Sequence, residues 1–362
     1  MTRFLRNGGA AVGAALLTVL LTSAPARADA MRDSQWYFAP MRLAEAQKLG
    51  KGGEGVTVAV VDSGVDGTHQ DLRGAMISGR NIARDVEDDN LDSGPHGTGM
   101  AVLIAGRGHG DGDGLLGVAP RSKVMSVTPT QDQPLIAEGI RWAVEHGAKV
   151  INMSFAQYEA GDAMREAIEE AVAADVVLVA GSGNDHKQVA FPAALPGVIA
   201  VGSVDRKNKA ASFSNYGDQL DIVAYGTAMT VARPHDRYEV VHGTSDSTAL
   251  VSGIAALMRA RYPEMSAAEV ADRLTSTAID RGAKGRDDYY GYGQVDAVAA
   301  LTAPRGATAT VSRAPALDDN PVAYVPVEKS KGLPPLLFVA IGVLLLVVCG
   351  ALFMIVRARR NS

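Results

Sequence analysis

Short, uninterrupted runs of apolar residues alternate with amphipathic segments along most of this chain. The apolar runs are rich in valine and isoleucine and have the length of strands, at residues 56–61, 123–128, 148–154, 175–181 and 197–204. The intervening segments, residues 134–147 and 162–174, repeat apolar side chains every three or four positions, as amphipathic helices do. Strands that are apolar throughout and are separated by helices predict an α/β fold, with helices on both faces of a mostly parallel central sheet.

A different apolar run, residues 10–21, lies near the start of the chain. It follows Arg3 and Arg6 and precedes small residues at Ala28 and Ala30. This order of positive, apolar and small residues is typical of a secretory signal peptide, with cleavage after Ala28 or Ala30. An uncleaved anchor is the alternative, but the run is short for a bilayer span. We therefore predict that residues 1–30 are a signal peptide.

The last long apolar run, residues 336–356, contains no charged side chain and is followed by three arginines. A helix of this length rises about 30 Å, enough to cross the hydrocarbon core. The run is too long and too uniformly apolar for a buried core helix. The arginines predict that residues 357–362 are a cytoplasmic tail, so the preceding part of the mature chain lies outside the cell membrane. Residues 302–335 hold six prolines and no periodicity, which is typical of a linker.

Composition limits the partners and the compartment. The chain has 35 basic and 40 acidic residues, a net charge of −5, which argues against a nucleic-acid-binding surface. Its one cysteine, Cys349, falls inside the predicted membrane helix, so no disulfide can hold the exported domain. Residues 31–301 are long enough to be held by a hydrophobic core alone.

Two candidate catalytic residues lie next to predicted elements, one after a strand and one at the start of a helix. Asp62 comes directly after the first apolar run, in VAVVDSGVD, and so lies at the carboxyl end of a strand, where open α/β folds place ligand sites. Taken alone, it could equally cap the turn at Gly64. His96 lies in GPHGTGMAVLIAG, where flanking glycines allow a substrate backbone to approach and a helix provides a rigid support. Most single histidines have no such role, and this chain has seven.

Two further candidates lie in glycine-rich contexts. Ser245, in HGTSDSTALVSG, begins an apolar helical run to about Ala260, and its hydroxyl is either a helix cap or a nucleophile at the positive end of the helix dipole. Asn184 ends VVLVAGSGN, where its amide either holds a left-handed turn or donates to an oxyanion. For each residue alone, the structural alternative stays open.

The order and setting of these four residues together resemble the subtilisin family, the subtilases. The similarity extends over about residues 35–301, through VAVVDSGVD, HGTGMA, GVAP, INMSFA, AGSGN, FPAALPGVIAVGSVD, ASFSNYG and GTSDSTALVSG. This resemblance implies a subtilisin-like three-layer fold and a serine endopeptidase acting on proteins or peptides. It also implies a role for each candidate: Ser245 as nucleophile, His96 as general base, Asp62 as the acid that orients it, and Asn184 as oxyanion donor.

The resemblance implies a substrate cleft as well, lined by two extended backbone segments, Ser154–Phe155–Ala156 and Ala180–Gly181–Ser182. The chain departs from the family pattern at two places. Gly99 stands where a second histidine is usual, and Asp246–Ala249 replaces a usual Met-Ala-Ser-Pro run. These changes bear on the shape of the cleft and on specificity, not on the triad.

The arrangement of the whole chain is similar to that of the mycosins, the subtilases associated with type VII secretion in actinobacteria. The grounds are a short distance between the signal peptide and the first strand, which leaves no room for a propeptide domain, and a proline-rich linker before a C-terminal membrane helix. The resemblance thus implies a membrane-anchored protease within or beside a type VII secretion complex. A generalist surface protease, and a structural subunit of such a complex with dispensable proteolysis, remain the alternatives.

Acidic residues cluster at 85–92 and at Asp111 and Asp113. Many subtilases bind calcium, but the first cluster lacks the glycine and the final glutamate of an EF-hand loop. We expect solvated loops and predict no cofactor or metal for the chemistry, while a structural calcium stays open.

Overall fold

A computed structural model describes residues 30–87 and 95–304 of the chain. The predicted signal peptide up to residue 29, the linker from residue 305 onward, the membrane helix and the tail lie outside these residues. Among the described helices, none combines the length and the apolar character needed to cross a bilayer.

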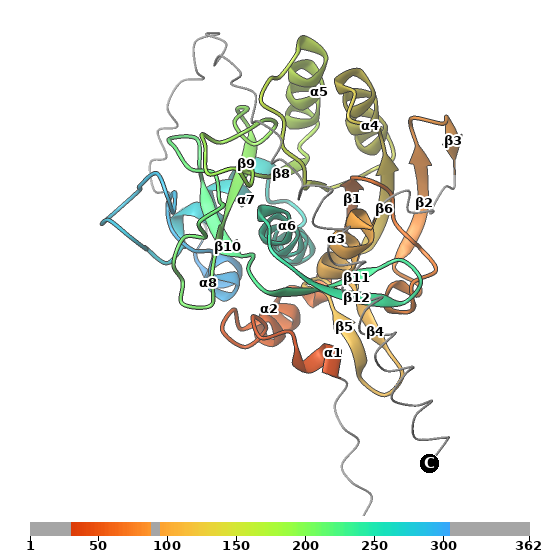
Figure 1. Ribbon diagram of the computed structural model, residues 1–362, viewed down its shortest axis with the longest axis horizontal. Helices are drawn as coiled ribbons and strands as arrows, with labels where there is room; N and C mark the ends of the chain where they lie inside the picture. Colours follow the sequence, from red (N-terminus) through yellow and green to blue (C-terminus); the bar gives the residue numbers. More distant parts are fainter. Residues whose placement is uncertain (1–29, 88–94, 305–362) are drawn as a thin grey trace, which may run out of the picture. The chain divides into compact units, whose positions relative to one another are not determined.

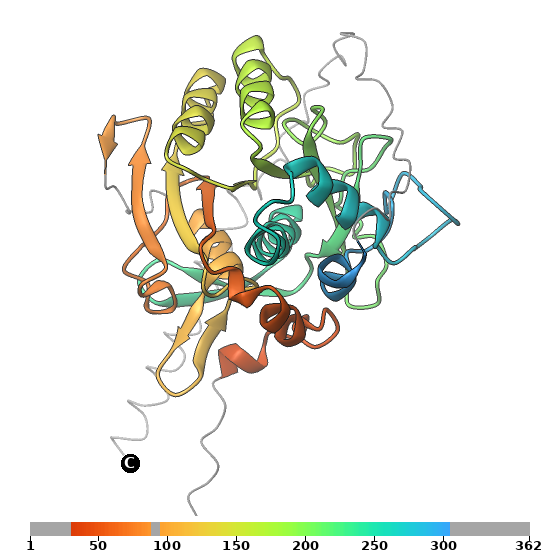
Figure 2. The same ribbon diagram turned by 180° about the vertical axis from the view of Figure 1, so that it is seen from behind.

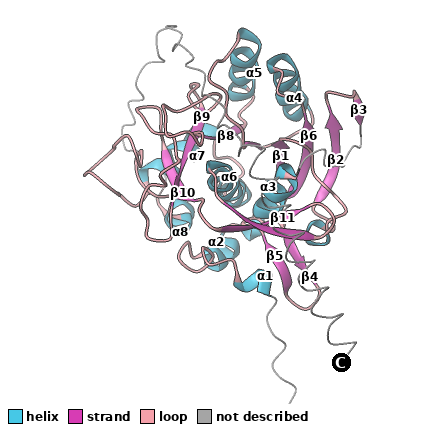
Figure 3. Ribbon diagram, in the orientation of Figure 1, coloured by secondary structure: helices cyan, strands magenta, loops and turns pink. Residues whose placement is uncertain are grey.

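The centre of the fold is an eight-stranded sheet, in the order β10-β9-β8-β7-β1-β6-β2-β3 (Figure 3). All neighbouring strands are parallel except the edge pair β2 and β3. The strands are β1 (Thr57–Val61), β2 (Met76–Asn81), β3 (Val86–Glu87), β6 (Lys123–Thr128), β7 (Val150–Met153), β8 (Val177–Gly181), β9 (Val198–Val204) and β10 (Ile222–Tyr225).

Two antiparallel hairpins lie outside the sheet. One pairs β4 (Arg107–His109) with β5 (Asp113–Leu116), and the other pairs β11 (Met229–Arg233) with β12 (Arg237–Val241). Strand β11 packs against helix α3 (His96–Ala105). The second hairpin therefore lies beside the helix that begins with His96.

Helices cover both faces of the sheet (Figures 1 and 2). One face carries α3 and α6 (Thr244–Arg261), and the other carries α4 (Gln133–Glu145) and α5 (Asp162–Ala173). The remaining helical segments are α1 (Ala30–Asp33), α2 (Leu43–Leu49), the short η1 (Lys51–Gly53) and η2 (Gln70–Leu72), α7 (Ala267–Ser276) and α8 (Ala297–Thr302).

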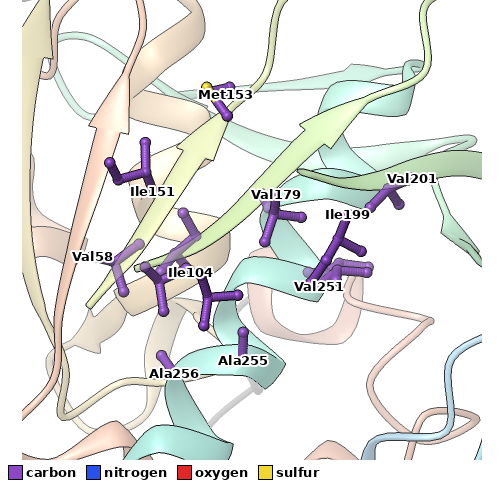
Figure 4. Close-up of a cluster of buried hydrophobic side chains, with 14 of the residues drawn as sticks. Val58, Ile104, Ile151, Met153, Val179, Ile199, Val201, Val251, Ala255 and Ala256 are labelled. Atoms are coloured by element: carbon purple, nitrogen blue, oxygen red, sulfur yellow. The ribbon is translucent and has the colours of Figure 1, made fainter. Parts of the chain in front are cut away.

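The main core lies between the sheet and the pair α3 and α6. Figure 4 shows side chains of β1, β7, β8 and β9 gathered over Val251 and Ala255 of α6 and over Ile104 of α3. All of these are at most 3% exposed, and burial of each large aliphatic side chain contributes about 1.5–3 kcal/mol. Small residues let α6 pack closely against the segment between β5 and β6: a Cβ at Gly253 would lie 2.5 Å from Val118 Cβ.

The sequence predictions for the central elements are confirmed. The five expected strands are β1, β6, β7, β8 and β9, and the two expected helices are α4 and α5, each within two residues of the predicted ends. The prediction missed β2, β3, β10 and the two hairpins. Strand β10 is buried but has only four residues, and the others are short or partly exposed, so none carries the long uninterrupted apolar run that marks a buried parallel strand.

The topology brings the candidate residues to one edge. Strands β1, β7 and β8 are neighbours and run parallel, so their carboxyl ends lie side by side. Asp62 follows β1, Ser154 follows β7, and Asn184 lies three residues beyond β8. Helices α3 and α6 begin at the same edge, with His96 and with Thr244.

Candidate active site

Asp62 and His96 form a close pair at the end of β1. The imidazole Nδ1 lies 2.9 Å from each carboxylate oxygen of Asp62. The carboxylate is 5% exposed and the imidazole is 39% exposed, so the acid is buried and the base faces outward. Glycine permits this approach: a Cβ at Gly97 would lie only 2.1 Å from the carbonyl oxygen of Gly64, so α3 rests directly on the turn after β1.

The environment of His96 favours its charged form. Burial is the largest single effect and lowers the pKa of the imidazole, but the charge and the hydrogen bond of Asp62, together with the charge of Asp246, outweigh burial and a smaller lowering effect of Arg233. The net pKa is above the ordinary value. With Nδ1 directed at the carboxylate as a donor, Nε2 carries the lone pair that can accept a proton.

Ser245 is the second residue of α6 and is partly exposed. Its hydroxyl donates to the backbone carbonyl of Ser154 at 3.2 Å. The described residues show no hydrogen bond from Ser245 to His96 in this resting state. Catalytic hydrogen bonds of this kind often form only when substrate binds, so the arrangement is compatible with proton transfer between the two.

Asn184 is fixed by the first residue of α6. Its Oδ1 accepts hydrogen bonds from the backbone N–H of Thr244 at 2.9 Å and from the Thr244 hydroxyl at 3.1 Å. The other polar atom of the amide, Nδ2, is a hydrogen-bond donor. A Cβ placed on Gly243 would lie 3.6 Å from this Nδ2 and 3.7 Å from the backbone nitrogen of Ser245. Two N–H donors thus border one small space, as an oxyanion site requires.

A chain of buried hydrogen bonds ties β7 to α6 beneath Ser245. The hydroxyl of Ser252 donates to Asn152 Oδ1 at 3.0 Å, and Asn152 Nδ2 donates to the hydroxyl of Ser154 at 2.9 Å. The Ser154 hydroxyl then donates to the backbone carbonyl of Ser245 at 3.2 Å. Asn152 and Ser252 are fully buried, so this chain fixes the first turn of α6 relative to the sheet.

A cavity of about 630 Å³ opens beside the Asp62–His96 pair. Ser154 and Phe155, two of the residues expected in the substrate cleft, line this cavity. Most of its other residues were not predicted. They lie at or after the ends of β2 and β6 and in α4, and include Asn81, Arg84, Thr128, Gln131 and Ile136. The cavity residues after β6 could have been predicted from the sequence, because they follow the carboxyl end of the apolar run at residues 123–128.

The comparison with protein families decides the class. Residues 53–293, more than half of the chain, match the profile described as Peptidase_S8, the Subtilase family. The chain belongs to the subtilase family. It is therefore a serine endopeptidase of the subtilisin type.

Individual subtilases are similar over most of their length. Subtilisin DY of Bacillus licheniformis is 34% identical over 275 residues, which are 73% of this chain and 97% of that protein. Subtilisin of Bacillus pumilus is 36% identical over 258 residues, 68% of this chain and 91% of that protein. The crystal structure of MycP1 with the N-terminal propeptide removed matches with a TM-score of 0.67 and 29% identity, covering 76% of this chain and 98% of that one.

The structure gives a reason for one departure of this subtilase from the family pattern. A Cβ at Gly99 would lie 3.1 Å from the carbonyl oxygen of Ala232 and 3.3 Å from Val231 Cβ, because β11 crosses α3 at this point. Even the first side-chain atom would be tightly packed there, so a histidine would require β11 to shift. The second departure, Asp246, is a carboxyl group buried in the first turn of α6.

The other predicted cleft residues lie close by but do not line the cavity. Ala180 and Gly181 end β8, and a Cβ at Gly181 would lie 3.1 Å from the hydroxyl of Thr244, so the strand passes directly under α6. Ser182 is fully buried and donates to the carbonyl of Asn215, whereas Ala156 is exposed.

A second histidine–carboxylate pair shows why sequence alone ranks histidines poorly. His109 Nδ1 lies 2.7 Å from Oδ1 of the buried Asp71. The other oxygen of Asp71 accepts from the hydroxyl of Tyr238 and from the N–H of Leu115, each at 2.9 Å, which marks a structural network. Within residues 30–87 and 95–304, no three histidine, cysteine or acidic side chains come together as metal ligands.

Proposed function

We propose that this chain is a membrane-anchored protease on the extracytoplasmic side of the cell membrane, with Asp62, His96 and Ser245 as its catalytic triad. The observation that carries the assignment is the pair of 2.9 Å contacts between His96 Nδ1 and the buried carboxylate of Asp62, at the sheet edge where Ser245 begins α6. A histidine held in this way presents Nε2 as a base.

In the reaction, the hydroxyl of Ser245 leaves the carbonyl of Ser154 and attacks the carbonyl carbon of the scissile peptide bond. His96 Nε2 takes the proton, and Asp62 stabilises the imidazolium that forms. Asn184 Nδ2 and the backbone N–H of Ser245 hold the developing oxyanion. The imidazolium then protonates the leaving amine, and a water molecule activated by His96 hydrolyses the acyl-enzyme.

The proposed location and partners rest on the ends of the sequence. The signal peptide (residues 1–30) and the apolar run of residues 336–356 support export and anchoring, and residues 302–335 would hold the domain away from the bilayer. The likeness to MycP1 over 98% of its chain supports a mycosin-like role, in or beside a type VII secretion complex. Its substrates would then be a small number of exported proteins.

Labelling of the full chain with a fluorophosphonate probe tests the triad. We expect labelling and peptide cleavage that disappear in Ser245→Ala and remain in Ser212→Ala, which changes an exposed serine away from the cavity. Labelling that persists in folded Ser245→Ala would contradict the assignment of the nucleophile.

The secretion role needs a separate test in cells. Loss of secretion in a strain carrying Ser245→Ala supports a proteolytic role. Normal secretion in that strain, combined with loss of secretion when the whole chain is deleted, would instead favour a structural subunit.

A further inference from the structure

The residue after the proposed nucleophile is an acid inside the protein. Asp246 is 1% exposed, and its Oδ2 has no hydrogen-bond partner among the described residues. Burying a carboxyl group without hydrogen bonds is costly, because the lost hydration is not replaced. Nearly all buried polar atoms in native proteins do have a partner, so this one requires a specific explanation.

Three ionisable groups interact electrostatically with Asp246, and each belongs to a different part of the fold. They are His96 at the start of α3, Arg233 at the end of β11, and the buried phenol of Tyr37 in the segment before α2. Arg233 is already occupied, since it donates to the carbonyl of Pro95 at 2.6 Å and pairs with Glu239 at 2.8 Å.

Tyr37 does not neutralise the acid either. Its hydroxyl accepts a hydrogen bond from Gln35 Nε2 at 2.8 Å, and the phenol carries no positive charge. Burial raises the pKa of Tyr37, and the charge of Asp246 adds to that rise, so the phenol stays neutral. The group interacting with Asp246 whose charge changes during the reaction is therefore His96.

We propose that Asp246 acts on the reaction through His96, as a second carboxyl group that stabilises the protonated imidazole from the side of α6. The inference rests on the proposed function, because it takes His96 as the general base. Asp246 is nearly inaccessible and so is out of reach of a substrate. It is a positioning residue that acts on the charge of His96, and Asp62 remains the group that holds the ring.

Titration of the two groups is expected to be coupled. Burial raises the pKa of Asp246 to about 7, against the opposing effects of His96 and Arg233. The pKa of His96 is also raised from its ordinary value near 6.5. The ionised acid favours the imidazolium and the imidazolium favours the ionised acid. Removing the acid should therefore let His96 lose its proton at a lower pH.

A packing role for Asp246 makes a different prediction. Asparagine has nearly the same shape as aspartate but carries no charge. If Asp246 only filled space in the first turn of α6, the substitution Asp246→Asn would leave the titration of His96 where it was. The titration midpoint of His96 therefore separates the two roles without any measurement of activity.

The test uses the full chain with Ser245→Ala and ¹³C-labelled histidine, followed by NMR from pH 5 to 9. Adding Asp246→Asn is expected to lower the titration midpoint of His96 by about half a pH unit or more. The matched control is Asp288→Asn, which removes one negative charge from an exposed loop and should leave the midpoint unchanged. An unchanged or raised midpoint in Asp246→Asn, or an equal fall in the control, would overturn the proposal.

A second measurement covers the case in which Asp246→Asn folds poorly. In the Ser245→Ala chain with residue 246 intact, ¹³C-labelled aspartate should show one carboxyl group that titrates near neutral pH. An Asp246 carboxyl that stays protonated from pH 5 to 9 would contradict the proposal, because a neutral acid cannot stabilise the imidazolium. Because both titrations are independent of cleavage, a chain that meets them and yet cleaves no peptide would contradict only the proposed function.

Discussion

Ser245 and Ser154 exchange two hydrogen bonds, each hydroxyl donating to the backbone carbonyl of the other residue at 3.2 Å. The proposed nucleophile is thus held by the end of β7 before any substrate arrives. The same two bonds connect the first turn of α6 to Asn152 and the centre of the sheet. Ser154 is in this way both a wall of the cleft and a support of the nucleophile.

Ser154→Ala separates these two functions. The substitution leaves the backbone carbonyl that accepts from Ser245 but removes the hydroxyl that joins Asn152 to α6. A buried amide donor then loses its partner, which should cost about 1–3 kcal/mol of unfolding free energy. We expect a lower midpoint in urea and a reduced kcat. Ser212→Ala serves as the control, and equal effects of both substitutions would contradict the supporting role.

Asn184→Ala should reduce kcat and leave KM nearly unchanged, because the amide donor is needed only when the oxyanion forms. Loss of the corresponding donor in subtilisin costs about 10²–10³ in kcat, and we carry that magnitude over to this relative. Single-turnover kinetics on a peptide ester measures the effect. A rise in KM with unchanged kcat would show that Asn184 binds the ground state instead.

Thr244→Val is the matched control for Asn184→Ala. Asn184 also holds the start of α6 through Thr244, and this substitution removes the Thr244 hydroxyl while keeping its N–H and the amide Nδ2 of Asn184. If Asn184 acted only by fixing α6, Thr244→Val would share a large part of the loss. The hydroxyl also accepts a hydrogen bond from the N–H of Gly183 at 3.3 Å, so two hydrogen bonds are lost while both oxyanion donors remain. We expect a fall in kcat of less than about tenfold.

Asp62→Asn should reverse the shift of His96. Burial is the largest single effect on the imidazole and lowers its pKa, and the charge and hydrogen bond of Asp62 are the main effects that oppose it, so without that charge the pKa should fall below the ordinary value. The acid limb of kcat/KM would move to lower pH, while kcat falls by about 10⁴ because the tautomer is no longer fixed. The pH profile of residual cleavage measures both, and an acid limb at the original pH would contradict the assignment.

The Asp62–His96 pair also predicts how the stability of the folded chain depends on pH. A folded-state pKa raised above the unfolded value stabilises the folded chain below about pH 6.5, and that stabilisation is lost as the pH rises through the raised value. Asp62→Asn should therefore lower the urea midpoint more at pH 5 than at pH 8. Equal effects at the two pH values would show that the pair contributes nothing through protonation.

How far the site could be read from the sequence differs between residues. Asp62 and Asn184 follow buried parallel strands, and the apolar runs alone place them at one edge of the sheet. The partner of the Ser245 hydroxyl could not be foreseen, because it is the backbone carbonyl of the residue after β7, 91 residues away. From the sequence, we expected His96 to be the partner of this hydroxyl.

The same limit explains the parts of the fold that were missed. Strand β11 consists of only five residues, yet its approach to α3 leaves little room at Gly99 and brings Arg233 against Pro95. Such contacts depend on how two distant segments pack, and no local pattern records them. Helix α7 is different, because Ser266 and Glu269 form a capping box that is visible in the sequence as S-x-x-E.

His109 and Tyr238 should contribute to stability and not to catalysis. Both bind the buried Asp71, and thereby join the hairpin β4–β5 and strand β12 to η2. Tyr238→Phe removes one hydrogen bond to a buried carboxyl group and should lower the unfolding free energy by about 1–3 kcal/mol. We expect kcat/KM to stay within about threefold of the parent value. A double-mutant cycle with His109→Gln should show coupling, and strict additivity would contradict a shared network.

Gly97→Ala should damage the triad without changing any of its side chains. A Cβ at residue 97 would lie 2.1 Å from the carbonyl oxygen of Gly64 and 3.2 Å from Asp62 Cβ, so backbone must shift and His96 must move relative to Asp62. We expect a loss of at least tenfold in kcat/KM, because displacements of about 1 Å in a catalytic group can cost roughly 10².

Gly99→Ala provides the matched control for this prediction, since it adds the same methyl group to the same helix. There the Cβ would lie 3.1 Å from the carbonyl oxygen of Ala232, a tight contact that involves no triad residue. Overpacking of this kind costs about 1–3 kcal/mol of stability, partly offset by the higher helix propensity of alanine. Peptide cleavage and urea unfolding should therefore separate the two variants: Gly97→Ala loses activity, and Gly99→Ala mainly loses stability. Equal losses of activity would show that the close contact of α3 with the turn after β1 is not what positions His96.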